Sequence, residues 1–306
     1  MIPKRILTAL VIVATICILG GFMFGCSSTA KTYRSDAEAI LNRPVIPVSE
    51  ASKTMGEKGR AYPEWNEPIQ EKHLQGLPPV VQNYLKQTGV IGKKMARTIR
   101  LHQTGGFRNS NDQKWMKTKA IQVYNIDSQE FVWFADVKMN PLMGFKGRDR
   151  LFEGKGAMTI KLMDMFKVVD ARGEKINQGS RMRLLNEMMW FPTAYLHPSI
   201  SWEAIDEYSA RVTMNFGDVT ESAVITFDEQ NRVANFIADR YMDRGNEPAT
   251  LEKWETPITE YGTINGLSLP ISGYAVWKLE KEEDFKYVYL NITDIKRNAS
   301  EPGNMR

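Results

Sequence analysis

FVWFADVKM, residues 131–139, is the stretch of this chain that decides the fold. Every odd-numbered position in it is apolar, and Asp136 and Lys138 stand between those positions. Successive side chains of a β-strand point to opposite faces of the sheet. The alternation therefore predicts a strand with one face buried against a core and the other face partly exposed.

The same period of two returns along most of the chain after residue 96. RVTMNF at 211–216 alternates strictly, and similar stretches lie at 97–103, 118–125, 158–162, 222–227, 232–241, 271–279 and 285–293. About nine or ten strands, separated by Gly, Asn or Asp and with little helix between them, are typical of a curved sheet or a sandwich. We expect a mainly β (α+β) fold, a large curved antiparallel sheet or half-barrel with one or two short covering helices.

Two segments have a helical pattern instead. LPPVVQNYLKQTG, residues 77–89, has its prolines where a first helical turn tolerates them and ends at Gly89, which predicts a short helix. SRMRLLNEMMW, residues 180–190, places four of its apolar residues on one helical arc. Pro192 ends that helix. We expect the second helix to cross the sheet.

Composition excludes several classes of protein. The chain has 306 residues, a net charge of +4 and 25% charged residues, which is ordinary for a globular protein and gives no reason to expect nucleic acid as a partner. Both cysteines lie in the first 26 residues, and the three histidines show no metal-ligand spacing. We therefore expect no disulfide in the folded body, no metal and no cofactor.

The first thirty residues have the pattern of an export signal. MIPKR carries two cations, residues 6–25 contain no charge, and the run ends at GCSS. This end resembles a lipobox, in which cleavage precedes a diacylated cysteine, here Cys26. An uncleaved membrane span over 6–25 and ordinary signal cleavage at Ser28–Ala30 are the alternatives. We expect an exported protein, attached to the bacterial cell membrane or outer membrane through its N-terminus by a lipid on Cys26 or by the span.

The chain divides by composition into four parts. Residues 1–25 are the signal peptide or membrane anchor. Residues 26–66 are polar, contain prolines and few large apolar groups, and indicate a flexible tether with room for a short helix over 35–41. Residues 67–298 form a single β-rich domain, and residues 299–306 form a tail.

Glu187 is the one candidate for a catalytic residue, and two interpretations of it stay open. Arg183 lies four residues earlier on the same helical face, which is typical of a solvent-exposed ion pair. Alternatively, the carboxylate lies beside Trp190 with a raised pKa and acts as a general base or holds a ligand. The sequence assigns no catalytic role between these two.

Arg148 is a candidate for the polar end of a ligand site. In the strand-like segment around it, Arg148 and Arg150 share one face and Asp149 takes the other. If the arginines face the concave side, they could hold a carboxylate or phosphate head group. If they do not, they are solvent-exposed residues.

Methionine usage suggests an apolar lining. Eight of the sixteen methionines fall within residues 139–189, where they form either an ordinary core or an adaptable pocket for a lipid-like ligand. For the pocket interpretation the candidate ligand-binding residues are Trp133, Arg148, Met158, Glu187, Met188, Met189 and Trp190.

The order of sequence blocks resembles that of a widespread bacterial family of uncharacterised proteins, known only as a domain of unknown function. The resemblance covers about 75–297 and rests on LPPVVQNYL, RLHQTGGFR, FVWFADV, RDRLFEGKGAM, LLNEMMWFPTAYL and LPISGYAVWKL, of which WFPTA is the most specific. It implies no activity, substrate or catalytic residue. More faintly, the strand-rich body resembles the half-barrel lipoprotein carriers of the bacterial envelope.

Three functions follow from these patterns, and we favour the first. It is an exported, membrane-anchored binding protein that holds an apolar or amphipathic, lipid-like ligand on the concave side of the sheet. The second is a cell-envelope hydrolase with Glu187 as general base. The third is a non-enzymatic scaffold for other envelope proteins, which would require an exposed apolar patch.

Overall fold

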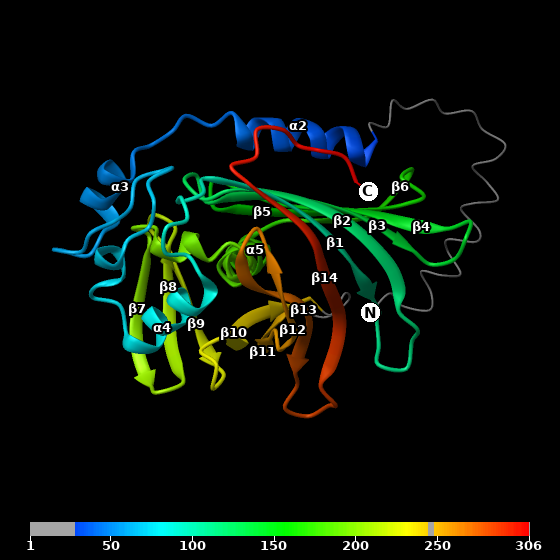
Figure 1. Cartoon of the computed structure of the whole chain (residues 1–306). Helices are drawn as coiled ribbons and strands as arrows, with labels where there is room; N and C mark the ends of the chain where they lie inside the picture. Colours follow the sequence, from blue (N-terminus) through cyan, green and yellow to red (C-terminus); the bar gives the residue numbers. More distant parts are fainter. Residues whose placement is uncertain (1–27, 244–247, 306) are drawn as a thin grey trace.

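Fourteen antiparallel strands join into one sheet in the computed structural model, which describes residues 28–243 and 248–305 (Figure 1). The strands are β1 (Thr98–Phe107), β2 (Met116–Asn125), β3 (Glu130–Lys138), β4 (Gly144–Phe152), β5 (Lys155–Leu162), β6 (Phe166–Ala171), β7 (Ile200–Asp206), β8 (Ser209–Asn215), β9 (Thr220–Phe227), β10 (Val233–Met242), β11 (Thr250–Glu255), β12 (Ile258–Ile264), β13 (Leu267–Lys278) and β14 (Phe285–Arg297). Their order across the sheet is β6-β5-β4-β3-β2-β1-β14-β13-β11-β10-β9-β8-β7, and β12 pairs with β13 beside this path.

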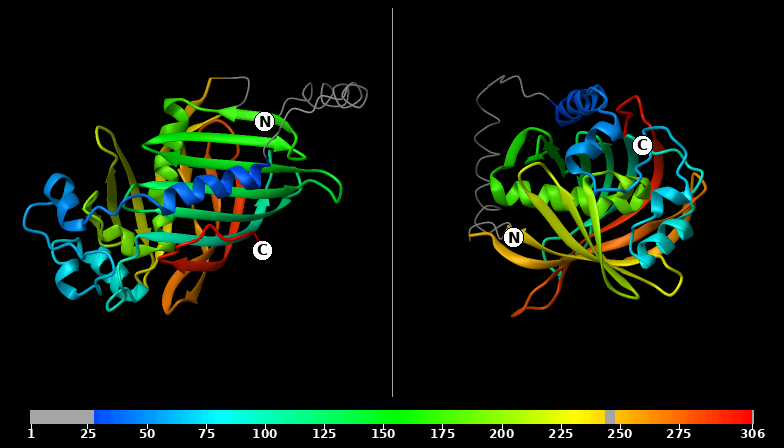
Figure 2. Two further views of the ribbon diagram at one scale, coloured as in Figure 1. Left: turned by 90° about the horizontal axis from the view of Figure 1, so that it is seen from above. Right: turned by 90° about the vertical axis from the view of Figure 1, so that its left-hand side faces the viewer.

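The sheet is strongly curved and remains open. Its two edges, β6 and β7, do not pair with each other in the part of the chain that the structure describes. The register shifts where β1 pairs β14 and where β13 pairs β14, and such bulges increase the local bend and twist of a sheet. This architecture confirms the predicted fold class, a mainly β protein built on a curved antiparallel sheet (Figure 2).

Helix α5 (Glu174–Glu187) lies within the curve of the sheet and connects its two halves (Figures 1 and 2). On one side it lies directly against β5. The two elements are so close that a side chain at Gly156 would collide with the Ile176 carbonyl and with Ser180. On the other side Arg181 donates to Glu221 of β9 at 2.8 Å. The predicted helix over 180–190 is therefore confirmed in part, but it begins earlier and becomes a 3-10 turn at Met188–Trp190, η2.

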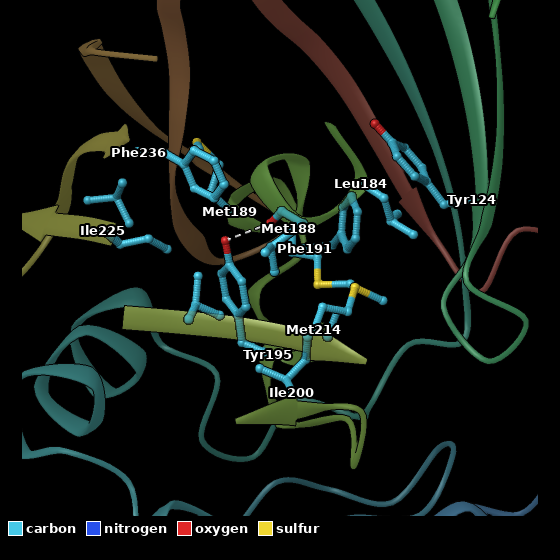
Figure 3. Packing of buried hydrophobic residues seen from close by; sticks show 14 of the residues in the cluster. Tyr124, Leu184, Met188, Met189, Phe191, Tyr195, Ile200, Met214, Ile225 and Phe236 are labelled. Atoms are coloured by element: carbon cyan, nitrogen blue, oxygen red, sulfur yellow. Dashed lines mark hydrogen bonds between the residues drawn. The ribbon is translucent and has the colours of Figure 1, made fainter. Parts of the chain in front are cut away.

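The main hydrophobic core fills one end of the concave side. After η2, a second 3-10 turn, η3 (Pro192–Leu196), turns the chain back into this core. Met188 and Phe191 are almost fully buried, and the Phe191 ring lies 4.7 Å from that of Tyr124 (Figure 3). Tyr195 anchors the turn by donating its hydroxyl to the Leu185 carbonyl at 3.2 Å. Burial of each large apolar side chain contributes about 1.5–3 kcal/mol.

Helix α4 (Pro79–Thr88) covers the same core, as its sequence predicts. Pro79 occupies the first turn, and Gly89 ends the helix with a φ of 84°, in the left-handed region that favours glycine. Tyr84 and Leu85 are buried, and the Tyr84 ring lies 5.4 Å from that of Phe227. A short 3-10 helix, η1 (Glu71–Leu74), precedes α4.

Residues 28–66 are not the flexible tether that their composition predicts. They form α2 (Thr29–Leu41) and α3 (Val48–Met55), and α2 lies along the convex face of the sheet (Figure 1). Tyr33, Ala37 and Ile40 form a second core with apolar residues of β2 and β3. The physical reason is that β2 and β3 are apolar on both faces, and their convex face therefore needs a cover.

The C-terminal tail packs beside α2. Pro302 accepts a hydrogen bond from the Tyr33 hydroxyl at 3.1 Å, and the Asn304 carbonyl contacts His102 at 2.9 Å. Among the helices in the described ranges, none has the length and apolar character needed to cross a membrane. The predicted signal or anchor at 1–25 and the predicted lipidation site at Cys26 lie outside the described residues.

Candidate functional site

A cavity of about 400 Å³ lies between α5 and the concave face of the sheet, beside the main core. Both halves of the sheet contribute to it, with β3, β5 and β6 on one side and β10, β11, β13 and β14 on the other. Its apolar wall is rich in large side chains, among them Phe107, Trp133, Met189, Trp254, Trp277 and Tyr287. This wall can take the hydrocarbon part of a ligand.

Arg183 is the centre of the polar wall. It projects from α5 and donates to three side chains: Glu187 at 2.7 Å, Asp149 of β4 at 2.8 Å and Gln122 of β2 at 3.0 Å. Its guanidinium also lies over the Trp133 ring, 4.9 Å from the centroid. One cation therefore holds two carboxylates in place and supports the aromatic wall.

Glu187 is buried, in contrast to the solvent-exposed ion pair that its spacing from Arg183 suggested. Besides Arg183, the carboxylate accepts from the Gln122 amide at 2.8 Å and from the Tyr124 hydroxyl at 2.9 Å. Burial raises the pKa of Glu187 above its usual range, and Arg183 acts against this rise. Three donors from the protein thus hold the carboxylate, which is an arrangement for fixing a charge in position.

Asp149 and Arg240 each line the cavity and carry a buried polar atom that lacks a hydrogen-bond partner among the described residues. These atoms are one carboxylate oxygen of Asp149, Oδ1, and Nε of Arg240. Burial raises the pKa of Asp149, while Arg183 and then Arg240 oppose the rise. The other carboxylate oxygen of Asp149 accepts from Arg183, and the Arg150 backbone N–H also acts on this carboxylate and lowers its pKa. Oδ1 therefore keeps lone-pair capacity that can meet a ligand.

Aromatic rings frame Arg240. Its guanidinium lies 4.6 Å from the Trp254 ring centroid and 5.8 Å from that of Trp277. Its Nη1 donates to the Tyr287 hydroxyl at 3.3 Å, and the same hydroxyl accepts from the Trp254 indole at 3.0 Å. Arg240 interacts electrostatically with Asp149, and its Nε has no hydrogen-bond partner among the described residues. Rings therefore fix the cation in position and leave a donor unsatisfied.

The structure brings five of the seven predicted ligand-binding residues to the cavity. These are Trp133, Met158, Glu187, Met189 and Trp190. Met188 is not among them, because it points into the main core and is fully buried there. The prediction for Met188 is therefore wrong.

Arg148 lies on the opposite face of the sheet from the cavity. It donates to Asp36 of α2 at 2.7 Å, and Arg150 contacts the same carboxylate at 3.4 Å. The alternation in β4 is as expected, but Asp149 takes the concave side, which forces both arginines to the convex side. The prediction that Arg148 lies at the polar end of the concave side is wrong, and the arginines that line the cavity include Arg183 and Arg240.

The methionine cluster divides among three environments and does not form one lining. Two line the cavity, Met158 and Met189, and two lie in the core, Met182 and Met188. The remaining four are exposed at hairpin tips: Met139, Met143, Met163 and Met165. Sequence clustering alone did not separate these positions.

Arg240 escaped the sequence analysis, although a signal for it exists. A register shift between Val233 and Asn235 changes which residues of β10 face the interior, from odd-numbered to even-numbered positions. Arg240 therefore lies on the same face of the strand as the buried residues Phe236 and Ala238. An arginine on the buried phase of a strand indicates a site. Across residues 28–243 and 248–305, no group of three His, Cys, Asp or Glu side chains is placed to hold a metal ion.

Comparison with known proteins gives a family. The model of a family of unknown function, DUF6544, matches residues 67–290. No curated protein matches the chain. Among solved structures, the chain is similar to a β-barrel-like protein of the domain of unknown function DUF1849 from Brucella abortus, with 7% identity and a TM-score of 0.25, over 66% of this chain and 98% of that one.

Proposed function

The chain belongs to the DUF6544 family of unknown function, and we propose that it is a binding protein for an amphipathic, lipid-like molecule. In this proposal the body is exported, stays at the membrane through its N-terminal segment, and holds the ligand in the cavity beside α5. The observation that carries the proposal is the combination of a large aromatic wall with two buried, unpaired polar atoms.

The size and lining of the cavity suit a small molecule with a hydrocarbon part. Ligand pockets are typically roughly 300–1,000 Å³, mostly apolar, with a few placed polar groups. A volume of about 400 Å³ falls within that range. Trp133, Met158 and Met189 offer the apolar contacts, and Met side chains adapt to flexible chains.

The two unpaired atoms define the ligand's polar head. Asp149 Oδ1 requires a hydrogen-bond donor, and Arg240 Nε requires an acceptor. A hydroxyl or a carboxamide offers both. A carboxylate would satisfy Arg240 but would bring a negative charge close to Asp149. We therefore propose an uncharged head with hydroxyl or amide groups, as in a monoacylated polyol.

The hydrolase alternative has less support. A general base needs a lone pair within reach of the substrate's proton. Glu187 is held by Arg183, Gln122 and Tyr124, and all four side chains act together as one buried cluster. That arrangement favours a structural role for Glu187.

Substituting Arg240→Met is expected to weaken ligand binding by at least about tenfold, because a hydrogen bond from a charged donor contributes roughly 1.5–3 kcal/mol. The full chain is purified from a native membrane extract in mild detergent, and the bound lipid is identified and counted per protein by mass spectrometry. The expected lipid has one acyl chain and an uncharged hydroxyl or amide head.

Arg211→Met is the matched control, since Arg211 is an exposed arginine on β8 whose guanidinium contacts Glu203 at 3.6 Å. It should retain as much lipid as the unsubstituted chain. Lipid-free protein in every preparation would contradict the binding function. Equal lipid retention by the Arg240→Met and Arg211→Met variants would contradict the role of Arg240 but not the binding function.

A further inference from the structure

Two neighbouring hairpin tips carry an unusual concentration of exposed apolar side chains. The tip between β3 and β4 exposes Met139, Leu142 and Met143, and the tip between β5 and β6 exposes Met163 and Met165. Leu142 is 87% exposed. Of the twelve large hydrophobic residues that are exposed in the described chain, these five fall within two short turns. We call these five residues the Met–Leu patch.

The two hairpin tips that carry the Met–Leu patch lie side by side. The backbone of Met139 donates to the Met143 carbonyl at 3.1 Å, which closes the first tip. Met163 donates to the Gly144 carbonyl at 2.9 Å, which ties the second tip to the first. Exposed apolar surfaces of this kind mark sites that contact another protein or a membrane.

The position of the N-terminal helix indicates which partner covers the patch. The backbone N–H of Thr29, the first residue of α2, donates to Asp164 at 3.0 Å, and its hydroxyl contacts the same carboxylate. Asp164 lies between Met163 and Met165. The uncharged segment 6–25 ends four residues before Thr29, a length that spans at most about 14 Å. The described chain therefore begins beside the patch, and the sequence preceding it there contains the uncharged segment 6–25.

Lysines flank the patch on the strands next to both tips. Lysines follow or precede the two tips: Lys138, Lys146, Lys161 and Lys167. Lys138 and Lys146 contact Asp136 at 3.4 and 2.6 Å, and Lys167 contacts Asp170 at 2.6 Å. Long lysine side chains can place their apolar stems against hydrocarbon while the charge stays at the head-group level.

The patch also lies at the end of the sheet that the cavity reaches. In the registers of β1 to β4, Gly106 is paired with Lys117, Lys117 with Lys138, and Lys138 with Gly144. The β3–β4 tip therefore extends from the same end of the sheet as Phe107 and Arg108, which line the cavity.

We propose that the Met–Leu patch inserts into the surface of a lipid bilayer and seats the sheet end, with the cavity beside it, on the membrane. The patch is a second point of membrane contact, independent of the N-terminal segment. It orients the protein so that an amphipathic molecule has a short path from the bilayer to the cavity.

Site-directed spin labelling tests the insertion in the full chain. Cys17→Ser and Cys26→Ser remove both native thiols, and the second substitution also removes the predicted lipidation site, so that an N-terminal lipid does not contribute to the insertion measured. Leu142→Cys or Met165→Cys then introduces one label site. The protein is reconstituted into phosphatidylcholine vesicles with and without phosphatidylglycerol. At both sites the label should be more accessible to oxygen than to a water-soluble nickel chelate, as within hydrocarbon.

The matched control is Val219→Cys, 41% exposed on the turn between β8 and β9, on the side of the molecule opposite β4 in Figure 1. Its label should be more accessible to the nickel chelate than to oxygen, which is the aqueous pattern. A companion variant carries the label at Met139→Cys together with Leu142→Asp and Met165→Asp, and its label should return to the aqueous pattern.

An aqueous pattern at 142 and 165 in both kinds of vesicle would overturn the proposal. So would spin–spin broadening at these sites, because it would place a second copy of the chain on the patch. Neither readout depends on whether the cavity holds a ligand. The proposal of membrane insertion can therefore be contradicted while lipid retention in the cavity is confirmed. Lipid retention can likewise fail while membrane insertion is confirmed.

Discussion

Arg183→Met is expected to lower the free energy of unfolding by about 3–5 kcal/mol, which is the usual cost of removing one partner from a buried charge pair. Arg183 is the cation that pairs with both Asp149 and Glu187, and both carboxylates are buried. Without it, the two carboxylates remain buried with no cation bonded to them, and only the neutral donors Gln122 and Tyr124 still hold Glu187. Urea denaturation at pH 7, followed by circular dichroism, measures the difference from the unsubstituted chain.

The pH dependence of the same variant is a second readout. Burial already raises the pKa of Glu187 and Asp149, and loss of Arg183 removes a group that opposes the rise. A carboxyl group whose folded pKa lies above its unfolded value favours the folded state below the unfolded pKa and loses that contribution as the pH rises through the folded pKa. The Arg183→Met variant should therefore recover stability relative to the unsubstituted chain as the pH falls from 7 to 5.

A double-mutant cycle measures the coupling free energy between Arg183 and Glu187 separately from the effect of each single substitution. Glu187→Gln keeps the shape of the side chain and removes one of the charges that Arg183 neutralises. The double variant Arg183→Met, Glu187→Gln should lose less stability than the sum of the two single variants. Arg211→Met, on the exposed side of β8, controls for loss of an arginine in general. A loss below about 1 kcal/mol in Arg183→Met would show that the cluster carries little of the stability.

The strands were predictable where one face is buried and the alternation is regular. All of the stretches with a period of two became strands, whereas β6, β7, β11 and β12 were missed. β7 is an edge strand with most of its residues exposed, so little burial is imposed on its sequence. β11 likewise buries only Trp254 fully. Period-two analysis depends on burial and loses its signal at such strands.

The extent of helix α2 and its packing on the sheet were missed for a different reason, since the sequence suggested only a short helix over 35–41 within a tether. Only Tyr33, Ala37 and Ile40, together with Thr29 at its start, are buried, and most of the other residues of the helix are polar. A polar composition with three spaced apolar residues is also that of a linker. The partner surface, Ile121, Val123, Val132 and Phe134, lies on strands about ninety residues later. Whether this segment is a linker or a packed helix depends on its contact with β2 and β3, which the local sequence does not reveal.

The site was predictable as to residue type and less so as to geometry. The spacing of Arg183 and Glu187 gave the ion pair, but its burial comes from Gln122 and Tyr124, which lie more than sixty residues away. The alternation in β4 placed Asp149 opposite Arg148, yet only the tertiary fold decides which face is concave. Arg240 depends on a bulge, which shifts the parity that a sequence pattern assumes.

His197 is expected to make the protein sensitive to mild acid. The imidazole is fully buried against the Trp65 ring at 5.6 Å, Nδ1 pairs with the Ser199 hydroxyl at 2.8 Å, and Nε2 has no partner among the described residues. Burial lowers the pKa of His197 to about 4. The unfolded chain therefore takes up this proton first, near the ordinary histidine pKa of about 6.5.

The sign follows from that difference. A histidine with a lowered folded pKa contributes stability that is present above about pH 6.5 and is lost as the pH falls toward 4, and a gap of roughly 2.5 pKa units corresponds to about 3 kcal/mol. His197→Asn keeps an acceptor for the Ser199 N–H and cannot be protonated in this range. Since Glu187 and Asp149 act with the opposite sign in both proteins, the relevant quantity is the stability difference between them. That difference should shrink by about 3 kcal/mol from pH 7.5 to pH 4 in urea denaturation, and a constant difference would mean that His197 is protonated as easily in the folded protein as in the unfolded chain.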